Sequence, residues 1–178
     1  GNLDVMDSVP AAFTKTFKTD KKVQAYSEAG SVIQTFTIPS SLDHFKNDEE
    51  GQLRRQAISM AINRENICDK VLNGTGTPAV DFTSPLTPGY SDSLKGVGNL
   101  KYNEKKAKEL WEKANAISPW TSDDKLTFAY NADGGHETTY TAVVNSINNT
   151  LGSEVAATNP YPTFNDYRTA VSDRKVQG

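Results

Sequence analysis

The chain has a single cysteine, Cys68, and two histidines among its 178 residues. One cysteine excludes an internal disulfide and a metal site built from several thiolates. No apolar run approaches the roughly 18 residues of a membrane-spanning helix. The N-terminus also lacks a basic segment followed by an apolar segment, the pattern of a secretion signal. Cys68 lies among Asn66, Ile67 and Val71, where a thiol that packs as a small apolar group is the ordinary case.

Basic charge is also scarce, since the formal net charge is −3. Contact with a nucleic-acid backbone requires a concentrated basic face. Four lysines lie between positions 15 and 22, but Asp20 interrupts them, so a solvated surface is favoured there. We therefore expect no nucleic-acid partner. The length suits one sizeable domain over residues 1–178.

Motifs of catalysis and cofactor binding are absent or incomplete. Gly74 to Ala79 superficially fits the dinucleotide pattern G-x-G-x-x-A, but the glycines follow a predicted helix rather than a strand. No phosphate-binding loop and no G-x-S-x-G nucleophile motif occurs. His136-Glu137 begins like a zinc-protease helix, yet position 140 is Tyr. The run 48–50 is acidic and is interpreted as a solvated loop. We predict no catalytic residue, no metal ligand and no cofactor.

The first half of the chain is predicted to be largely helical, with one strand. The stretch 31–38 is rich in β-branched residues and ends at Pro39, which is typical of a strand. Small and apolar residues at helical spacing predict a helix over 53–62. The remaining expected features are a short helix over 10–18 capped by Ser8, a polar loop over 40–51, a second helix begun by Asn63 and ended by Gly74, and an extended loop over 74–100.

The second half alternates between strands and helices. Asn103 is expected to cap a helix whose apolar stripe includes Leu110 and Trp111. Strands are predicted over 126–130 and 154–158, a helix over 136–151 between them, and a last helix capped by Thr163. A strand–helix–strand–helix order normally builds a right-handed parallel crossover. The sequence thus predicts an α/β fold, with a further strand expected after the last helix.

His136 is the histidine with a possible role in binding. It follows the turn 131–135 between a predicted strand and helix, and ligands collect beyond the carboxyl ends of strands in open α/β sheets. An ordinary exposed histidine at a helix N-terminus is the alternative, and the sequence favours it. Trp111 belongs to the core stripe of its helix, whereas Trp120 could either pack or stack on a ligand.

Several segments together resemble the extracellular solute-binding proteins of family 5, the oligopeptide- and dipeptide-binding proteins of ABC importers. Arg54 to Glu65 is similar to the family's Arg-x-Ala-Leu/Ile-x-x-Ala-Ile-Asp-Arg block, with Asn63 in place of Asp. Tyr102 to Ala114 is similar to its Tyr-x-x-x-x-Ala-x-x-Leu-Leu-x-x-Ala helix, with Trp111 as the second Leu. The other matching segments are 1–5 with 9–10, 71–79, 88–90, 128–131 and 164–168.

The resemblance implies one lobe of a two-lobed clamshell of the type II periplasmic-binding-protein kind, with a mixed sheet flanked by helices. Residues 1–178 would be most of the C-terminal lobe, truncated before part of the ligand site. It implies a peptide ligand, ABC permease subunits as partners, and an extracytoplasmic location. Contact with the membrane would come only through the permease or a lipid anchor outside these residues. It further implies that His136 and Arg168 approach the carboxyl end of the peptide, although a surface ion pair would be the ordinary role of Arg168.

Other functions remain open at this point. The same fold could bind an oligosaccharide, a nickel chelate or a signalling peptide. A small α/β hydrolase that uses Asp and His residues is an alternative of another class. A third possibility is an interaction module whose loop 74–100 contacts a protein partner.

Overall fold

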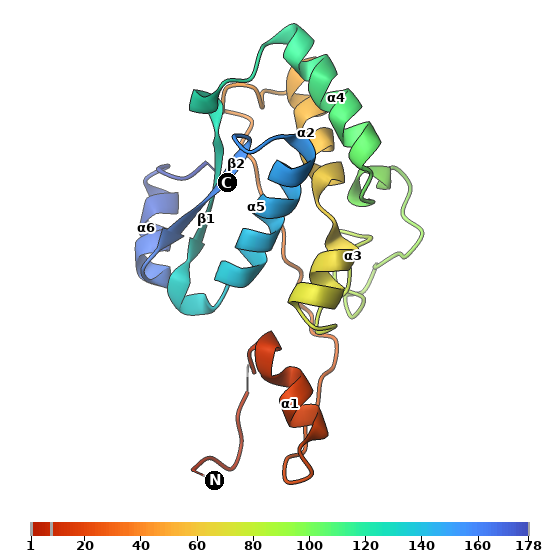
Figure 1. The fold of residues 1–178 in the computed structure, drawn as a ribbon, viewed down its shortest axis with the longest axis vertical. Helices are drawn as coiled ribbons and strands as arrows, with labels where there is room; N and C mark the ends of the chain where they lie inside the picture. Colours follow the sequence, from red (N-terminus) through yellow and green to blue (C-terminus); the bar gives the residue numbers. More distant parts are fainter. Residues whose placement is uncertain (1, 8, 178) are drawn as a thin grey trace.

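The computed structural model describes residues 2–7 and 9–177, so the predicted cap Ser8 lies outside the described residues. Figure 1 shows an α/β body from which an N-terminal arm projects. No helix among residues 2–7 and 9–177 is long and apolar enough to cross a bilayer. The helices are α1 (Thr14–Thr19), α2 (Glu49–Ala61), α3 (Arg64–Asn66), α4 (Glu104–Ile117), α5 (Glu137–Leu151) and α6 (Phe164–Ser172).

Two strands, β1 (Leu126–Asn131) and β2 (Ala156–Tyr161), pair in parallel from Leu126↔Ala156 to Asn131↔Tyr161. Helix α5 connects them, and α5 and α6 flank the pair on two sides (Figure 1). The expected strand–helix–strand–helix order and the α/β class are confirmed. The sheet within the described residues is parallel rather than mixed.

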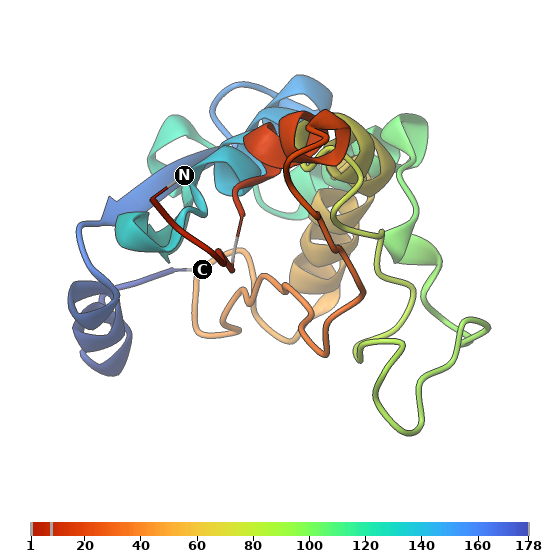
Figure 2. The same ribbon diagram turned by 90° about the horizontal axis from the view of Figure 1, so that it is seen from below.

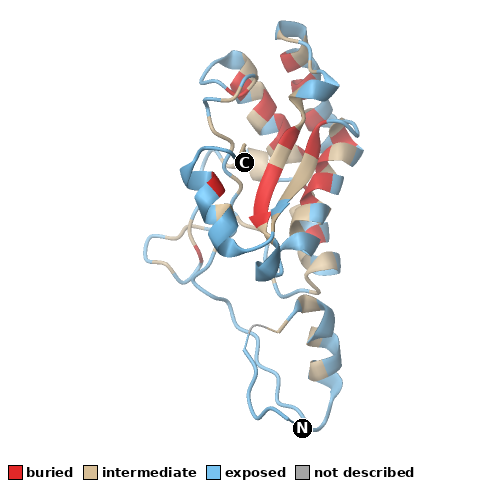
Figure 3. Ribbon diagram, turned by 90° about the vertical axis from the view of Figure 1, so that its left-hand side faces the viewer, coloured by how far each residue is buried: buried red, intermediate tan, exposed pale blue. Residues whose placement is uncertain are grey.

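The core lies where α2 and α4 pack together and against the strand pair through α5. Three alanines at this contact, Ala57, Ala61 and Ala107, are completely buried. Their small side chains allow the helix backbones to approach closely, as the spacing in the sequence indicated. Figure 3 shows the buried positions gathered on the strands and the neighbouring helices, whereas the arm is exposed or only partly buried.

The predicted strand over 31–38 is wrong, because the structure has no strand there. A strand requires a second backbone for its ladder, and no described backbone hydrogen bond involves residues 31–38. Side-chain packing holds the segment instead. The Phe36 ring meets those of Phe128 on β1 and Tyr140 on α5 edge-on, with centroids 5.4 and 5.2 Å away.

Helix α2 begins earlier than predicted, at Glu49, because Asp48 caps it by accepting a hydrogen bond from the Gly51 N–H (2.9 Å). The interpretation of 48–50 as a solvated loop is therefore wrong. Gly51 also lies against the chain that enters the helix. A Cβ at this position would lie 1.9 Å from the Lys46 carbonyl oxygen, so only glycine fits.

The other helix ends agree with the sequence. The side chains of Asn63, Asn103 and Thr163 cap α3, α4 and α6 by accepting from the N–H three residues ahead. After α3, a π-helical turn (Ile67–Val71) completes the second predicted helix. Gly74 follows with φ of 74°, the left-handed conformation expected at its end. Loop 74–100 contains one 3-10 turn (Gly98–Leu100) among its described residues.

Arg54 on α2 is completely buried despite its charge. Its Nε donates to Glu50 Oε1 (2.8 Å), and its two terminal nitrogens donate to Asn115 Oδ1 (3.1 Å) and the Ser118 carbonyl (2.6 Å). Asn115 lies on α4, and Ser118 is the residue that ends it. One guanidinium thus joins α2 to the C-terminal end of α4.

Two tryptophans flank the same guanidinium. Its Cζ lies 4.6 Å from the Trp111 ring centroid and 5.0 Å from the Trp120 ring centroid. A cation over an indole face gains electrostatic stabilisation that increases when water is excluded. Trp111 is buried, as predicted from its helical stripe. Trp120 packs on Trp111 and Phe45, so in this chain it is a packing residue.

His44 extends the network to the segment before β1. Its Nδ1 lies 2.5 Å from Glu50 Oε1, and its Nε2 lies 3.3 Å from Asp124 Oδ1. The hydroxyl and backbone N–H of Thr121, together with His44, hold the pKa of Asp124 below its usual value. His44 therefore links the entry to α2 with the 3-10 turn Ser122–Asp124.

Replacing Gly51 with Ala should destabilise the protein, because its methyl group would overlap the Lys46 carbonyl. We expect a loss of about 1–3 kcal/mol in the free energy of unfolding, measured by urea denaturation. Gly98→Ala is the matched control, since a Cβ there meets no atom within 4 Å. Equal stability of the two variants would contradict the close approach at Gly51.

Replacing Arg54 with Ala should cost about 3–5 kcal/mol, because it removes one partner of a buried ion pair and leaves the other uncompensated. Arg54→Lys should recover only part of the loss, since an ammonium cannot bond to all three acceptors in the same fork geometry. Thermal and urea denaturation measure both effects. If Arg54→Ala cost no more than Lys105→Ala, a change at an exposed position of α4, the network would not be a major source of stability.

Candidate functional site

The carboxyl ends of β1 and β2 meet at one edge of the sheet, because the strands are parallel. β1 continues into a 3-10 turn (Ala132–Gly134), then Gly135 with φ of 71°, and then His136 at the start of α5. β2 leads through the cap Thr163 into α6, which carries Arg168. Both residues predicted to bind ligand therefore lie on segments that leave the same edge.

Asp133 joins these two segments. Its Oδ2 accepts a hydrogen bond from the backbone N–H of Phe164 (3.1 Å), and its Oδ1 accepts from Asn131 Nδ2 (2.7 Å). These donors, the Asn131 amide first, hold the pKa of the Asp133 carboxyl below its ordinary value. The ionised carboxylate thereby fixes the turn after β1 against the start of α6.

His136 owes its position to the glycines before it. A Cβ on Gly134 would lie 2.6 Å from both Cδ2 and Nε2 of the His136 ring. The ring can adopt this position because Gly134 has no side chain. The ring itself is exposed to solvent, with its centroid 6.4 Å from that of Tyr140. His136 is thus held at the edge and remains accessible.

Arg168 is exposed on α6, and no hydrogen bond or ion pair joins its side chain to another described residue. The ordinary surface ion pair considered for it is therefore not seen in the described part of the chain. Aromatic rings accompany it: Tyr167 lies 6.2 Å from Tyr161 and 6.4 Å from Phe164 between centroids. His136 at the start of α5 and Arg168 within α6 thus lie on the two segments that follow β1 and β2.

Two tyrosines lie behind the edge. Burial raises the pKa of Tyr130 and of Tyr140, whose rings stack 4.6 Å apart between centroids. Both phenols therefore stay neutral well above physiological pH. The edge combines a guanidinium, an imidazole and aromatic faces, which suits recognition of a carboxylate beside apolar groups.

The hollows found in the structure lie elsewhere. One of about 230 Å³ borders His44 and Asp124, and another of about 390 Å³ lies between the π turn and α5, with Asn66 and Asn145 in its lining. Neither includes His136 or Arg168. No cluster of three or more His, Cys, Asp or Glu residues suited to a metal ion occurs within 2–7 and 9–177. His136 and Arg168 are exposed, and they border neither of these two hollows.

The sequence did not single out Asp133 or the role of Arg54. Asp133 lies in the turn 131–135, from which the sequence singles out only the following His136. Two features of the sequence could have indicated the contact between Asp133 and Phe164. One is an acidic residue in the turn after a strand, and the other is a helix that starts at Phe164. Cys68 is half-buried, and burial raises the pKa of its thiol. Both observations agree with a packing role.

The model of the bacterial extracellular solute-binding proteins, family 5 (middle part), matches residues 1–177. The dipeptide-binding protein DppE of Bacillus subtilis is 28% identical over 162 residues, which are 89% of this chain and 28% of that protein. The periplasmic oligopeptide-binding protein OppA of Salmonella typhimurium is 33% identical over 117 residues, 64% of this chain and 21% of that protein. The chain spans less than a third of the length of these curated relatives.

Solved structures show the same fold. The unliganded open form of the murein tripeptide-binding protein MppA matches with a TM-score of 0.65 and 22% identity, covering 96% of this chain and 32% of that one. The oligopeptide-binding protein AppA of Bacillus subtilis, in complex with a nonapeptide, matches with a TM-score of 0.64 and 22% identity over 92% of this chain and 32% of that one.

Replacing Asp133 with Asn should remove part of the acid sensitivity of the fold. The folded pKa of Asp133 is lowered, so its contribution to stability is complete above the ordinary value near 3.8 and is lost as the pH falls through the folded pKa. Urea denaturation at about pH 6 and about pH 3 measures this. The native protein should lose more free energy of unfolding between the two pH values than Asp133→Asn. An identical loss in both proteins would contradict the tether.

Proposed function

This chain belongs to family 5 of the bacterial extracellular solute-binding proteins, and on that premise we propose that it is a lobe of the substrate-binding component of an ABC importer for peptides. The match of the family model to residues 1–177 carries the proposal. The named relatives add support, since they include dipeptide-, oligopeptide- and murein-peptide-binding proteins.

The lobe would be the truncated C-terminal one of a two-lobed receptor. Its relatives are more than three times as long as the matched segment, which is 28% and 31% of two of them. The open edge that carries His136 and Arg168 is consistent with half of a cleft, because a ligand there would be enclosed only when a second lobe closes over it. The activity is binding and release, and we propose no catalytic role and no cofactor.

Arg168 is proposed to bind the ligand's terminal carboxylate, with His136 as a second donor. A guanidinium offers two parallel N–H donors to a carboxylate, and Arg168 is exposed on α6. His136 lies on the turn that Asp133 fixes against the start of the same helix. The neighbouring rings of Phe164 and Tyr167 would pack against ligand side chains.

The permease subunits of the importer are the proposed partners, and the location is extracytoplasmic. Two of the relatives are named as periplasmic proteins. A lipid anchor would lie in the longer protein, outside these residues.

The class of ligand is the part of the proposal that most needs a test. Isothermal calorimetry of the longer receptor against a peptide library should give saturable binding. Oligosaccharides, nickel–histidine complexes and signalling peptides form the comparison set. Binding of an oligosaccharide with failure of every peptide would overturn the peptide assignment. Turnover of a peptide or ester would favour the hydrolase alternative.

Replacing Arg168 with Ala should weaken peptide binding by about 10- to 100-fold, the range expected for loss of a hydrogen bond to a charged group. The loss should disappear for peptides whose C-terminus is amidated, because the carboxylate that Arg168 binds is then absent. Calorimetry of the longer receptor measures both ligands.

Lys105→Ala is the control, since it removes one positive charge from an exposed position on α4. Its affinity for either peptide should be unchanged. If Arg168→Ala weakened the free and the amidated peptide equally, Arg168 would not be the carboxylate ligand. His136→Ala should show the same pattern with a smaller effect.

A further inference from the structure

Helix α5 carries two asparagines whose side chains have no structural partner. Asn145 and Asn149 lie four residues apart, so they project from the same face of the helix. Both are exposed, and no hydrogen bond joins either side chain to another described residue. The neighbouring Asn148 shows the structural alternative, because its Nδ2 donates to the Ala156 carbonyl and its Oδ1 accepts from the Ala156 N–H (2.9 Å each). Asn145 and Asn149 are therefore available to a ligand.

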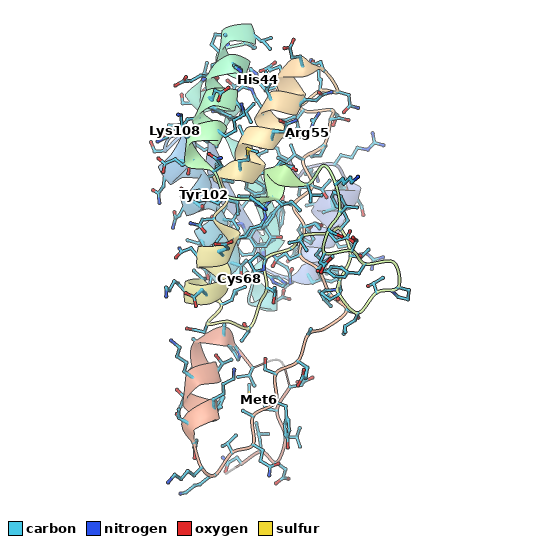
Figure 4. The ribbon with its side chains drawn as sticks, turned by 90° about the vertical axis from the view of Figure 1, so that its right-hand side faces the viewer. Met6, His44, Arg55, Cys68, Tyr102 and Lys108 are labelled. Carbon is cyan, nitrogen blue, oxygen red and sulfur yellow. The ribbon has the colours of Figure 1, made fainter. Side chains whose placement is uncertain are left out.

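The hollow of about 390 Å³ between α5 and the π-helical turn is lined by these two asparagines and by two more from the α3 segment, Asn63 and Asn66. We call it the asparagine hollow. Tyr102 also lines it, and Figure 4 places this residue between Lys108 on α4 and Cys68 on the π-helical turn. The volume is within the range of about 300–1,000 Å³ that is typical of small-molecule sites. Four carboxamides from separate segments thus converge on one space of suitable size.

A buried threonine faces the same space. Thr150 lines the hollow and is only 4% exposed, yet no hydrogen bond joins its hydroxyl to another described residue. The hydroxyl of Ser146, which also lines the hollow, is fully used instead: it donates to the Ala61 carbonyl (2.8 Å) and accepts from the Asn63 N–H (2.9 Å). A buried hydroxyl without a partner is unfavourable. A polar ligand in the hollow would supply the missing hydrogen bond to Thr150.

The lining indicates an uncharged ligand. Glu104 is the one charged residue in the described lining, and Lys108 pairs with it. No cationic side chain lines the hollow to bind a phosphate or a carboxylate. A carboxamide both donates and accepts hydrogen bonds, which matches the neighbouring hydroxyl groups of a sugar. The side chain of Ile67 and the ring of Tyr102 add apolar surface for the C–H face of a sugar ring.

We propose that the asparagine hollow binds a neutral saccharide of one or two rings. Its hydroxyl groups bond to the carboxamides and to Thr150, and one face of a ring packs on Tyr102.

This site is separate from the proposed carboxylate site. Neither His136 nor Arg168 lines the hollow, and Figure 2 shows α6 and α3 on opposite sides of the body. The inference therefore does not depend on the peptide assignment.

Ligand-observed NMR titration of the longer receptor tests the proposal, with glucose, N-acetylglucosamine and maltose as probes. At least one sugar should bind saturably. Asn145→Ala and Thr150→Val should each raise its dissociation constant about 5- to 10-fold, as expected for one lost hydrogen bond. Thr150→Val keeps the shape of the side chain and removes an unpartnered hydroxyl, so urea denaturation should show an unchanged or higher free energy of unfolding.

Thr141→Ala is the matched control, because Thr141 is exposed on the same helix but lies outside the lining of the hollow. The dissociation constant of the sugar should be unchanged in this variant. An equal loss of affinity in Thr141→Ala and Asn145→Ala would overturn the proposal, since the effect would then be a general one on α5.

The remaining outcomes also decide the proposal. Failure of all three sugars to bind saturably overturns it. A loss of sugar binding in Arg168→Ala but not in Asn145→Ala would place the sugar at the strand edge and would likewise overturn it. Sugar binding that depends on Asn145 and Thr150 in a receptor that binds no peptide would support the hollow and refute the peptide assignment.

Discussion

The buried guanidinium of Arg54 is the interaction on which most of this structure depends. It joins α2 to the end of α4 through three hydrogen bonds and lies between two tryptophan rings. A charge taken out of water is costly unless every donor finds an acceptor, so its presence requires Glu50, Asn115 and Ser118 to hold their positions. Because α2 and α4 pack on α5, this network also supports the strand pair.

A rigid strand pair in turn determines where the candidate ligand residues lie. Parallel pairing brings the ends of β1 and β2 to one edge, and Asp133 fixes the turn that precedes His136 against the helix that carries Arg168. His136 and Arg168 are exposed there and border neither of the two hollows described above. In the proposed two-lobed receptor, this edge would form one wall of the ligand cleft, and a second lobe would close over it by a hinge.

The sequence predicted correctly those features that depend only on interactions between nearby residues. Asn103 and Thr163 cap their helices because a side-chain oxygen and the N–H it satisfies are three residues apart. The predicted strand at 31–38 failed because strand formation depends on a second backbone, which β-branched composition does not supply. The acidic run at 48–50 was also misjudged, since Asp48 caps α2 and Glu50 contacts Arg54 and His44.

The sequence by itself determined the strand–helix–strand–helix order of the second half, the caps Asn63, Asn103 and Thr163, the family, and the choice of His136 and Arg168 as candidate residues. These follow from periodicity, from hydrogen bonds that span a few residues and from a conserved order of segments recognised as a resemblance. The tertiary structure alone decided that Arg54 is buried between two tryptophans and that Asp133 bridges two segments. Burial and long-range contact depend on which surfaces meet in three dimensions, and the spacing of residues along a chain does not specify that.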